Sequence, residues 1–146
     1  MSSNNQNQDT IRHFYEATGE EIYDLLDDVL NVDIVLHDPH LDDIRGRNRV
    51  ENYYTSFHDA FPNVEFTIDD LFATNEGVAV RWTAEGTHEG EFWGIEPTEN
   101  EIHLSGIDIV RVDDGRINEV WTVYDSATLL QQLDVELPIT PPTGGS

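Results

Sequence analysis

The hydrophobic positions in the first part of the chain follow helical spacing, with apolar side chains three or four residues apart. Two such segments contain Ile11, Phe14, Tyr15, and then Ile22, Leu25, Leu26, Val29 and Leu30. We expect two helices here, interrupted at Gly19, because glycine is a poor helix former. A third helix, which Pro62 ends, is predicted by the apolar face Val50, Tyr53, Tyr54, Phe57 and Phe61. Residues 31–37, which are rich in β-branched side chains and end at Asp38-Pro39, predict a short strand before it.

From residue 64 onward the hydrophobic period changes to two, which is typical of strands with one buried face. The positions expected to face inward on the first three of these strands are Val64, Phe66, Ile68; Val78, Val80, Trp82, Ala84, Gly86, His88; and Ile102, Leu104, Gly106, Asp108, Val110, Val112. A turn at residues 113–116 leads to a last strand with Ile117, Trp121, Val123 and Asp125 in the same register. Leu129, Leu130 and Leu133 then predict a short closing helix.

Helices followed by a meander of long strands indicate the α+β class. We expect the three N-terminal helices to cover one face of a curved antiparallel sheet. A length of 146 residues points to one domain. We place this domain at residues 8–134, between a flexible N-terminus at 1–7 and a flexible, proline- and glycine-rich tail at 138–146.

The composition is strongly acidic, with 30 Asp and Glu against 7 basic residues, a formal net charge of −23, no lysine and no cysteine. Disulfides, thiolate metal sites, cysteine nucleophiles and lysine Schiff bases are therefore excluded. The charge argues against nucleic acid and against anionic membrane surfaces as partners. We interpret it as a halophile-adapted acidic surface, because molar salt screens such self-repulsion. No targeting signal or membrane-spanning run is visible, so we expect a cytoplasmic protein.

Four ionisable residues occupy inward positions of the predicted strands: His88, Asp108, Glu119 and Asp125. Of the two on the last strand, only Asp125 lies at the end of the strand, beside the start of a helix, so His88, Asp108 and Asp125 are the candidates. If the sheet curls around a cavity, these groups and two tryptophans, Trp82 and Trp121, would line one pocket. Carboxylates and a histidine among apolar side chains are suited to general acid–base catalysis, because burial raises the pKa of a carboxyl group toward neutrality.

Each of these residues also has a structural interpretation. Asp125 precedes the closing helix and could be its N-cap. Asp108 could form an ion pair with Arg81 or Arg111. His88, near the end of its strand, could face solvent.

Two histidine-containing stretches, His37-Asp38-Pro39-His40 and His88 with Glu91, have no specific metal-ligand spacing, so we expect no metal site. The chain also has no glycine-rich phosphate loop and no nucleophile-elbow motif.

Residues 86–98, GTHEGEFWGIEPT, resemble the GTHxGxFxGIxPTG signature of the SnoaL-like polyketide cyclases, a family of the NTF2-like superfamily. Further similar stretches are His37–Pro39, Arg45–Arg47, Phe57–Asn63, Gly106–Arg111, Asp114–Trp121 and the segment from Asp125 to Leu133, so the resemblance covers about residues 8–134. The chain departs from the family pattern at Glu99, where the family has glycine, and at Val120, where many relatives have histidine.

The resemblance implies a cone-shaped fold with an internal cavity, and ring closure by intramolecular aldol condensation without cofactor or metal. It assigns the acid–base role to an aspartate near the end of the last strand, which corresponds to Asp125. Asp108 or His88 would be the assisting polar group. The residues expected to contact substrate are His37, Tyr54, Phe57, Trp82, Phe92, Trp93 and Trp121.

We therefore expect a cofactor-independent acid–base enzyme, of the aldol cyclase, isomerase or dehydratase type, acting on a small, largely apolar carbonyl compound. One alternative is a small-molecule-binding domain without catalysis. Another is an interaction module that uses the outer face of the sheet. We also expect a homodimer through that face, which should carry Ile107, Ile109, Thr122 and Tyr124.

Overall fold

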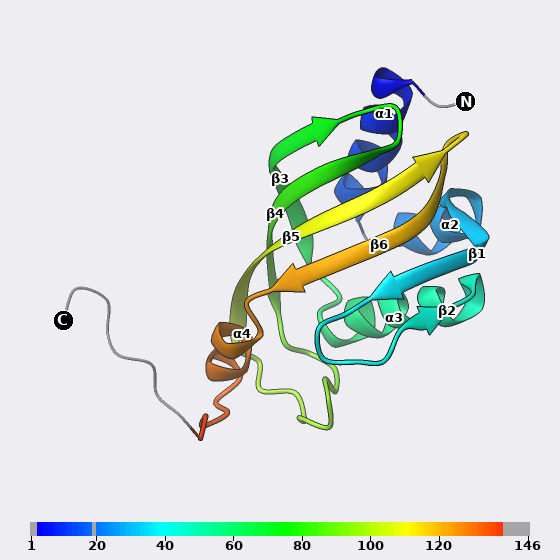
Figure 1. The fold of residues 1–146 in the computed structure, drawn as a ribbon. Coiled ribbons are helices and arrows are strands. Elements are labelled where there is room, and N and C mark those ends of the chain that lie inside the picture. Colours follow the sequence, from blue (N-terminus) through cyan, green and yellow to red (C-terminus); the bar gives the residue numbers. More distant parts are fainter. Residues whose placement is uncertain (1–2, 19, 139–146) are drawn as a thin grey trace.

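The computed structural model describes residues 3–18 and 20–138 (Figure 1). Its elements are α1 (Asn4–Glu16), α2 (Glu21–Val29), β1 (Leu30–His37), β2 (Ile44–Arg45), α3 (Arg47–Ala60), β3 (Glu65–Ala73), β4 (Gly77–Thr87), β5 (Glu101–Asp113), β6 (Arg116–Tyr124) and α4 (Ser126–Gln132). The expected α+β class is confirmed. Each of the three predicted N-terminal helices and the closing helix is present, although Gly19, the expected break between the first two, lies outside the described residues.

The six strands form one curved sheet in the order β2-β1-β6-β5-β4-β3. The sheet is mixed rather than antiparallel as predicted, because β1 runs parallel to β6, with Leu36 opposite Val120 and His37 opposite Trp121. The other neighbouring strands are antiparallel. The sequence pattern could not reveal this pairing, because no hairpin turn joins β1 to β6.

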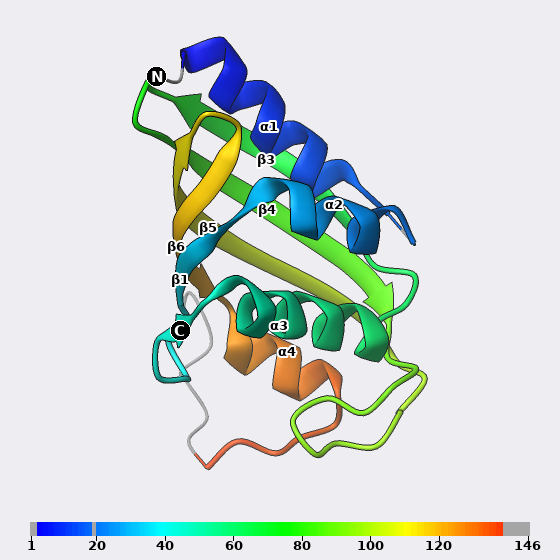
Figure 2. The same ribbon diagram turned by 90° about the vertical axis from the view of Figure 1, so that its right-hand side faces the viewer.

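The helices α1, α2 and α3 lie on the same side of the sheet, as predicted, and α4 lies at one end (Figures 1 and 2). The core fills the space between these helices and the inner face of the sheet. Its largest fully buried side chains include Ile11, Leu26, Leu30, Ile34, Leu36, Phe61, Ile117 and Leu129.

The predicted inward faces of β4 and β5 are confirmed. Val78, Val80, Trp82 and Ala84 are buried on β4, and Ile102, Leu104, Asp108, Val110 and Val112 are buried on β5. The alternation holds because the two strands pair without interruption from Gly77 opposite Arg111 to Thr87 opposite Glu101. Asp108 therefore points toward the helices from the middle of the sheet.

The predicted register of β6 is wrong beyond its first residues, and a β-bulge is the reason. Val112 of β5 pairs with Ile117, but the preceding Arg111 pairs with Glu119, so Asn118 is an extra residue in β6. One extra residue exchanges the two faces of a strand. Trp121 and Val123 consequently point outward, while Thr122 is buried on the inner face and Tyr124 reaches the internal pocket.

The N-terminal boundary differs from the prediction of a flexible segment at residues 1–7. The helix α1 begins at Asn4, and the Ser3 hydroxyl caps it by accepting a hydrogen bond from the Gln6 N–H. Asn7 is fully buried and donates a hydrogen bond from Nδ2 to the carbonyl oxygen of Thr74. The predicted flexible tail lies almost entirely outside the described residues, as do residues 1 and 2.

A bilayer-spanning helix would need about 20 mostly apolar residues. Within residues 3–18 and 20–138, no helix has the length and apolar character to cross a membrane.

Candidate active site

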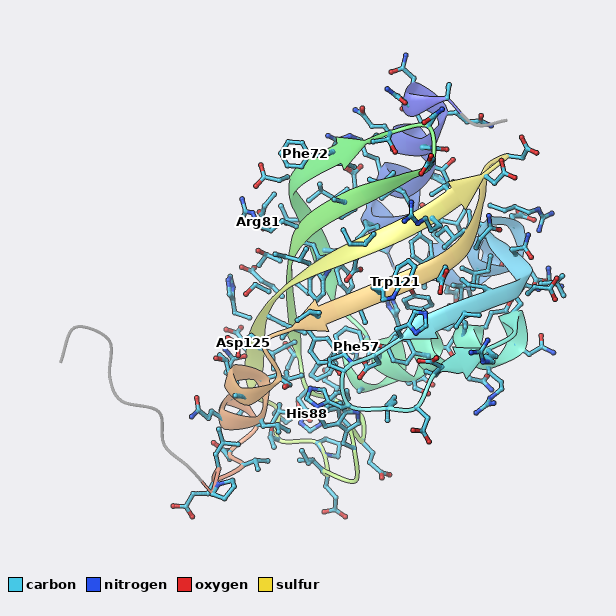
Figure 3. All side chains as sticks on the ribbon, in the orientation of Figure 1. Phe57, Phe72, Arg81, His88, Trp121 and Asp125 are labelled. Atoms are coloured by element: carbon cyan, nitrogen blue, oxygen red, sulfur yellow. The ribbon has the colours of Figure 1, made fainter. Side chains whose placement is uncertain are left out.

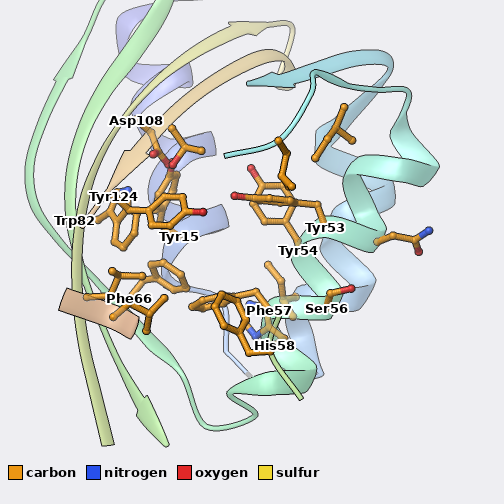
Figure 4. A pocket seen from close by; sticks show the side chains of 18 of the residues that line it. Tyr15, Tyr53, Tyr54, Ser56, Phe57, His58, Phe66, Trp82, Asp108 and Tyr124 are labelled. Carbon is orange, nitrogen blue, oxygen red and sulfur yellow. The ribbon is translucent and has the colours of Figure 1, made fainter. Parts of the chain in front are cut away.

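An internal pocket of about 640 Å³ lies between α3 and the inner face of the sheet, a volume typical of small-molecule sites (Figure 4). Its walls are mainly aromatic and come from both the helical layer and the strands. The aromatic side chains lining it are Phe14, Tyr15, Tyr53, Tyr54, Phe57, Phe66, Trp82, Phe92, Trp93 and Tyr124.

Among the described residues, the carboxylate buried in the wall of this pocket is that of Asp108, which β5 presents on its inner face with 6% of its surface exposed. The Tyr15 hydroxyl, from α1, donates a hydrogen bond to Asp108 Oδ2. The other carboxylate oxygen, Oδ1, and Trp82 Nε1 are also buried, and neither completes a hydrogen bond of regular geometry within the described part of the chain. Asp108 Oδ1 therefore lies in the pocket wall beside Thr122 and Trp82 without a regular hydrogen bond to a described residue.

Burial raises the pKa of Asp108, while the neighbouring polar groups of Thr122, Tyr15 and Trp82 act in the opposite direction. The raised pKa makes its carboxylate a stronger proton acceptor than an exposed aspartate. Burial, together with the charge of Asp108, also raises the pKa of Tyr15 and Tyr54, so both phenols remain protonated hydrogen-bond donors.

Tyr54 is the phenol that is free to contact a ligand. Its ring packs edge-on against Phe14 at 5.4 Å and against Tyr53 at 5.4 Å between centroids. Its hydroxyl makes no hydrogen bond to any residue that the structure describes, although it belongs to the pocket wall. Tyr54 could therefore donate to a ligand oxygen close to Asp108.

A second buried carboxylate, Asp38, holds two pocket tyrosines in place. Asp38 Oδ2 accepts hydrogen bonds from the Tyr53 hydroxyl at 2.7 Å and from the Tyr124 hydroxyl at 2.9 Å. Its Oδ1 accepts from the His40 N–H at 2.8 Å. The hydrogen bonds of Asp38 thus come from α3, β6 and the β1–β2 loop, and we assign it the role of positioning the two pocket tyrosines.

Six of the ten residues predicted for the site line this pocket: Tyr54, Phe57, Trp82, Phe92, Trp93 and Asp108. Trp93 is 46% exposed and stacks on Phe92 with ring centroids 4.8 Å apart. Its φ of 50° places the backbone in the left-handed region, within the loop that joins β4 to β5.

Asp125 does not face the pocket, so that prediction is wrong. It is exposed, and its Oδ1 accepts a hydrogen bond from the Thr128 N–H at 3.2 Å as the N-cap of α4 (Figure 3). The bulge at Asn118 is the physical cause, because it exchanges the faces of β6 before the strand reaches residue 125. The alternative interpretation of Asp125 as an N-cap is confirmed.

His88 is also outside the pocket lining, and it is fully buried rather than solvent-facing. Its Nδ1 accepts a hydrogen bond from the Thr98 N–H at 3.1 Å, which places the ring proton on Nε2. The ring packs against Phe61, with centroids 5.4 Å apart. His88 therefore holds together the two ends of the β4–β5 loop.

His37 and Trp121 lie on the outer side of the sheet and not in the pocket. Their rings stack with centroids 5.0 Å apart. His37 bonds to Glu119 at 2.6 Å and to Asp43 at 2.8 Å. The hydrogen bond to Glu119 raises the pKa of His37, and Asp43 adds to the shift. Both residues were predicted to contact substrate, and the structure places them elsewhere.

The sequence interpretation missed several residues of the pocket, including Tyr15, Tyr53, Tyr124 and His58. Tyr15 and Tyr53 could have been found from the sequence, because both lie on apolar helix faces. A phenol hydroxyl that is buried there needs a hydrogen-bond partner, which indicates a polar group nearby. His58 carries no such signal, because it occupies an ordinary position on an amphipathic helix. It is nevertheless buried, and burial lowers its pKa, against an opposing effect of Asp59.

The histidine stretches considered for metal binding are engaged otherwise, His37 with carboxylates and His88 with Thr98. Over the described ranges, no group of three or more His, Asp or Glu side chains is arranged to hold a metal ion.

The family model described as SnoaL-like polyketide cyclase matches residues 8–133. Among solved structures, IdmH of Streptomyces antibioticus, a proposed polyketide cyclase, is 33% identical, with a TM-score of 0.74 over 89% of this chain and 99% of its own. A proposed SnoaL-like polyketide cyclase of Jannaschia sp. CCS1 is 14% identical, with a TM-score of 0.82 over 92% of this chain and 95% of its own. AclR of Streptomyces galilaeus, a proposed hydroxylase, is 24% identical, with a TM-score of 0.81 over 95% and 87%. The similarity to the proteins of Jannaschia sp. CCS1 and Streptomyces galilaeus establishes the fold alone. A search of curated proteins found no match to the chain.

Proposed function

The chain belongs to the SnoaL-like polyketide cyclase family, and from this premise we propose that it is an acid–base enzyme that removes a proton next to a carbonyl group. The observation that supports this most is Asp108, a buried carboxylate in the wall of an aromatic pocket, one oxygen of which makes no regular hydrogen bond in the described part of the chain. The substrate is a largely apolar carbonyl compound small enough for about 640 Å³. Asp108 replaces Asp125 as the proton acceptor.

The proposed step is a proton transfer from the substrate to Asp108, and no other reactant is consumed. Asp108 Oδ1 takes the proton from the carbon next to the carbonyl, and the electrons of that C–H bond move to form the C=C bond of an enolate. The charge that develops on the carbonyl oxygen is stabilised by the Tyr54 hydroxyl, which donates a hydrogen bond to it. Tyr15 acts as a positioning residue, because its hydrogen bond to Oδ2 fixes the orientation of the carboxylate.

Ring closure, isomerisation and dehydration can all follow from this enolate. In ring closure the enolate carbon attacks a second carbonyl carbon of the same molecule, and Asp108 returns its proton to the alkoxide. In isomerisation Asp108 returns the proton to a different carbon. In dehydration the enolate expels a hydroxyl group from the β-carbon, and this group takes the proton of Asp108 and leaves as water. None of the three routes transfers electrons to or from an outside group, so the proposed chemistry requires no redox cofactor.

A second function, ligand binding without catalysis, is favoured by one observation. The aspartate to which the family resemblance assigns the acid–base role, Asp125, caps α4 at the surface. If catalysis depended on that position, the pocket would only bind its ligand.

Deuterium exchange separates the two functions. 1-Tetralone is a compact aromatic ketone, and its C2 protons exchange with D2O when a base removes them. We expect the wild-type protein to accelerate this exchange and Asp108→Asn to reduce the acceleration by about 100-fold or more, the range of general-base catalysis. Asp125→Asn is the matched control and should exchange at the wild-type rate. Binding of 1-tetralone without accelerated exchange would support the binding function, and an effect of Asp125→Asn equal to that of Asp108→Asn would contradict the assignment of Asp108.

A further inference from the structure

The pocket contains a second ionisable side chain, His58, which the proposed step does not use. His58 lies in the last turn of α3 with 7% of its surface exposed. Neither ring nitrogen forms a hydrogen bond or ion pair with another residue in the described ranges. The nearest carboxylate in sequence, Asp59, accepts a hydrogen bond from the Tyr23 hydroxyl at 3.1 Å. His58 is thus a buried polar group in the pocket wall whose hydrogen-bonding capacity is not used by the fold.

His58 and Asp108 lie at different ends of the pocket. Figure 4 shows Asp108, from the sheet, on one side of the view, and His58, from α3, on the other. Asp108 is close to Tyr15 and Trp82, whereas the rings nearest to His58 are those of Phe57 and Tyr23, at 6.4 Å between centroids in both cases.

A continuous series of aromatic contacts connects the two ends. Phe57, next to His58, contacts Phe66 at 6.1 Å between ring centroids. Phe66 in turn contacts Trp82 at 5.3 Å and Tyr15 at 6.3 Å, and the Tyr15 hydroxyl bonds to Asp108. Ring faces and edges of this kind favour flat, unsaturated ligands over bulky aliphatic ones.

We propose that His58 is a second polar contact for the ligand, and that it bonds an oxygen substituent at the end of the ligand opposite the reacting carbonyl. A neutral imidazole offers one N–H donor and one nitrogen acceptor, so it can bond a phenol or a second carbonyl. Burial lowers the pKa of His58, which keeps the ring in this neutral form. The placement of the reacting carbonyl at Asp108 rests on the proposed function, but the contact at His58 does not.

Two probes of the same bicyclic frame test the contact. 1-Tetralone has only the ketone oxygen, and 6-hydroxy-1-tetralone adds a phenol at the opposite end of the molecule. Their dissociation constants would be measured by calorimetry at a mildly acidic pH, where the phenol is protonated. We expect the wild-type protein to bind the hydroxylated probe about tenfold more tightly, the value of one buried hydrogen bond.

The variant His58→Phe retains an aromatic ring against Phe57 but cannot form the hydrogen bond. We expect it to bind the two probes equally, while His58→Gln, which keeps a donor and an acceptor, retains part of the preference. Thermal unfolding of each variant establishes that it is folded. A full preference for the hydroxylated probe in His58→Phe overturns the inference, and so does failure of the wild-type protein to bind either probe at millimolar concentration.

The deuterium exchange measurement distinguishes failure of the His58 contact from failure of the proposed function. If the wild-type protein distinguishes the probes through His58 but does not accelerate exchange, the contact at His58 stands and the catalytic proposal fails. If Asp108→Asn loses exchange yet keeps the preference for the hydroxylated probe, both hold.

Discussion

Trp82 of β4 lies directly over Gly106, its partner across the strand on β5. A Cβ atom at position 106 would be 2.3 Å from Trp82 Cζ2 and 2.8 Å from the carbonyl oxygen of Val123. Only glycine leaves room for the indole there, two residues before Asp108 on the same face. The position of Trp82 beside Asp108 therefore depends on the absence of a side chain at residue 106.

Replacing this glycine should disturb the pocket. We expect Gly106→Ala to displace the Trp82 ring and to lower the free energy of unfolding by about 1–3 kcal/mol, the usual cost of overpacking. Tryptophan fluorescence, chemical denaturation and binding of 1-tetralone would detect the two effects. Ser105→Ala, at the exposed neighbouring position, is the control and should change none of them. Wild-type stability and binding in Gly106→Ala would contradict the packing argument.

The raised pKa of Asp108 predicts a pH-dependent difference in stability between the wild-type protein and Asp108→Asn. Burial raises this pKa above its ordinary value of 3.8, so the folded protein keeps the proton at pH values where the unfolded chain has lost it. The wild-type protein therefore loses stability as the pH rises between the unfolded and the folded pKa.

Asp108→Asn has no proton to lose at this position. Its free energy of unfolding should increase relative to that of the wild-type protein across the same pH interval and then level off. Denaturation of both proteins in high salt, from about pH 3 to about pH 8, measures this difference. If the free energy of unfolding of the wild-type protein instead increases relative to that of Asp108→Asn as the pH rises, the pKa of Asp108 is lowered in the folded protein.

The strand patterns predicted the position of Asp108 correctly but not that of Asp125, and one residue accounts for the difference. On β5 the alternation of Ile102, Leu104 and Val110 is regular, so counting by twos places Asp108 inward. On β6 the same counting fails at Asn118, where two residues of β6 occupy the space opposite one of β5. Nothing in the local sequence marks this bulge, because it depends on pairing with a neighbouring strand.

The pocket was predictable in composition but not in its hydrogen bonds. Helical spacing placed Tyr15, Tyr53 and Tyr54 on the apolar faces of their helices. It could not show that Tyr15 reaches Asp108, 93 residues away, or that Tyr53 shares Asp38 with Tyr124. Such contacts depend on how helices lie over the sheet, which the period of a pattern does not specify.

The N-cap role of Asp125 predicts a loss of stability without a loss of chemistry. Asp125→Ala removes the acceptor for the Thr128 N–H and should lower the free energy of unfolding by about 1 kcal/mol. Asp125→Asn and Asp125→Ser keep a capping oxygen and should remain close to the wild-type protein. Exchange of 1-tetralone should be unchanged in all three, and its loss in Asp125→Asn would restore the catalytic assignment that the geometry contradicts.

The outer face of the sheet supports our proposal of a homodimer, with two of its four predicted residues corrected. Ile107 and Ile109 are exposed there as expected, but the β6 bulge places Trp121 and Val123 beside them instead of Thr122 and Tyr124. Ile107 pairs with Val123 and Ile109 with Trp121 across the strands, which makes a continuous apolar patch. We expect sedimentation in high salt to show a dimer that Val123→Glu converts to a folded monomer. A monomeric wild-type protein at micromolar concentration would contradict the proposal.

The acidic surface predicts that folding depends on salt. The net charge is −23, and two of the seven basic residues, Arg81 and Arg47, are each shared between two carboxylates. Arg81 lies 2.6 Å from Asp70 and 3.7 Å from Asp69, and Arg47 lies 3.6 Å from Asp27 and 3.9 Å from Glu51. A hydrogen bond to Asp27 raises the pKa of Glu51 most, and burial and the negative charge of Asp27 add to the shift. Most of the other acidic side chains have no cation beside them in the described part of the chain.

The salt concentration determines how far repulsion between the carboxylates lowers the stability of the folded protein, because dissolved ions screen the charges. The Debye length increases from about 3 Å in molar salt toward about 30 Å as the ionic strength falls, so distant carboxylates begin to repel one another. We expect the melting temperature to fall continuously from molar sodium chloride to tens of millimolar. Sucrose in place of salt is the control, since it favours the compact state without screening charge, and it should not restore the full melting temperature at low ionic strength. A melting temperature that is constant over this range, or that sucrose restores completely, would mean that charge repulsion does not limit the stability of this protein and that its acidic surface is no adaptation to salt.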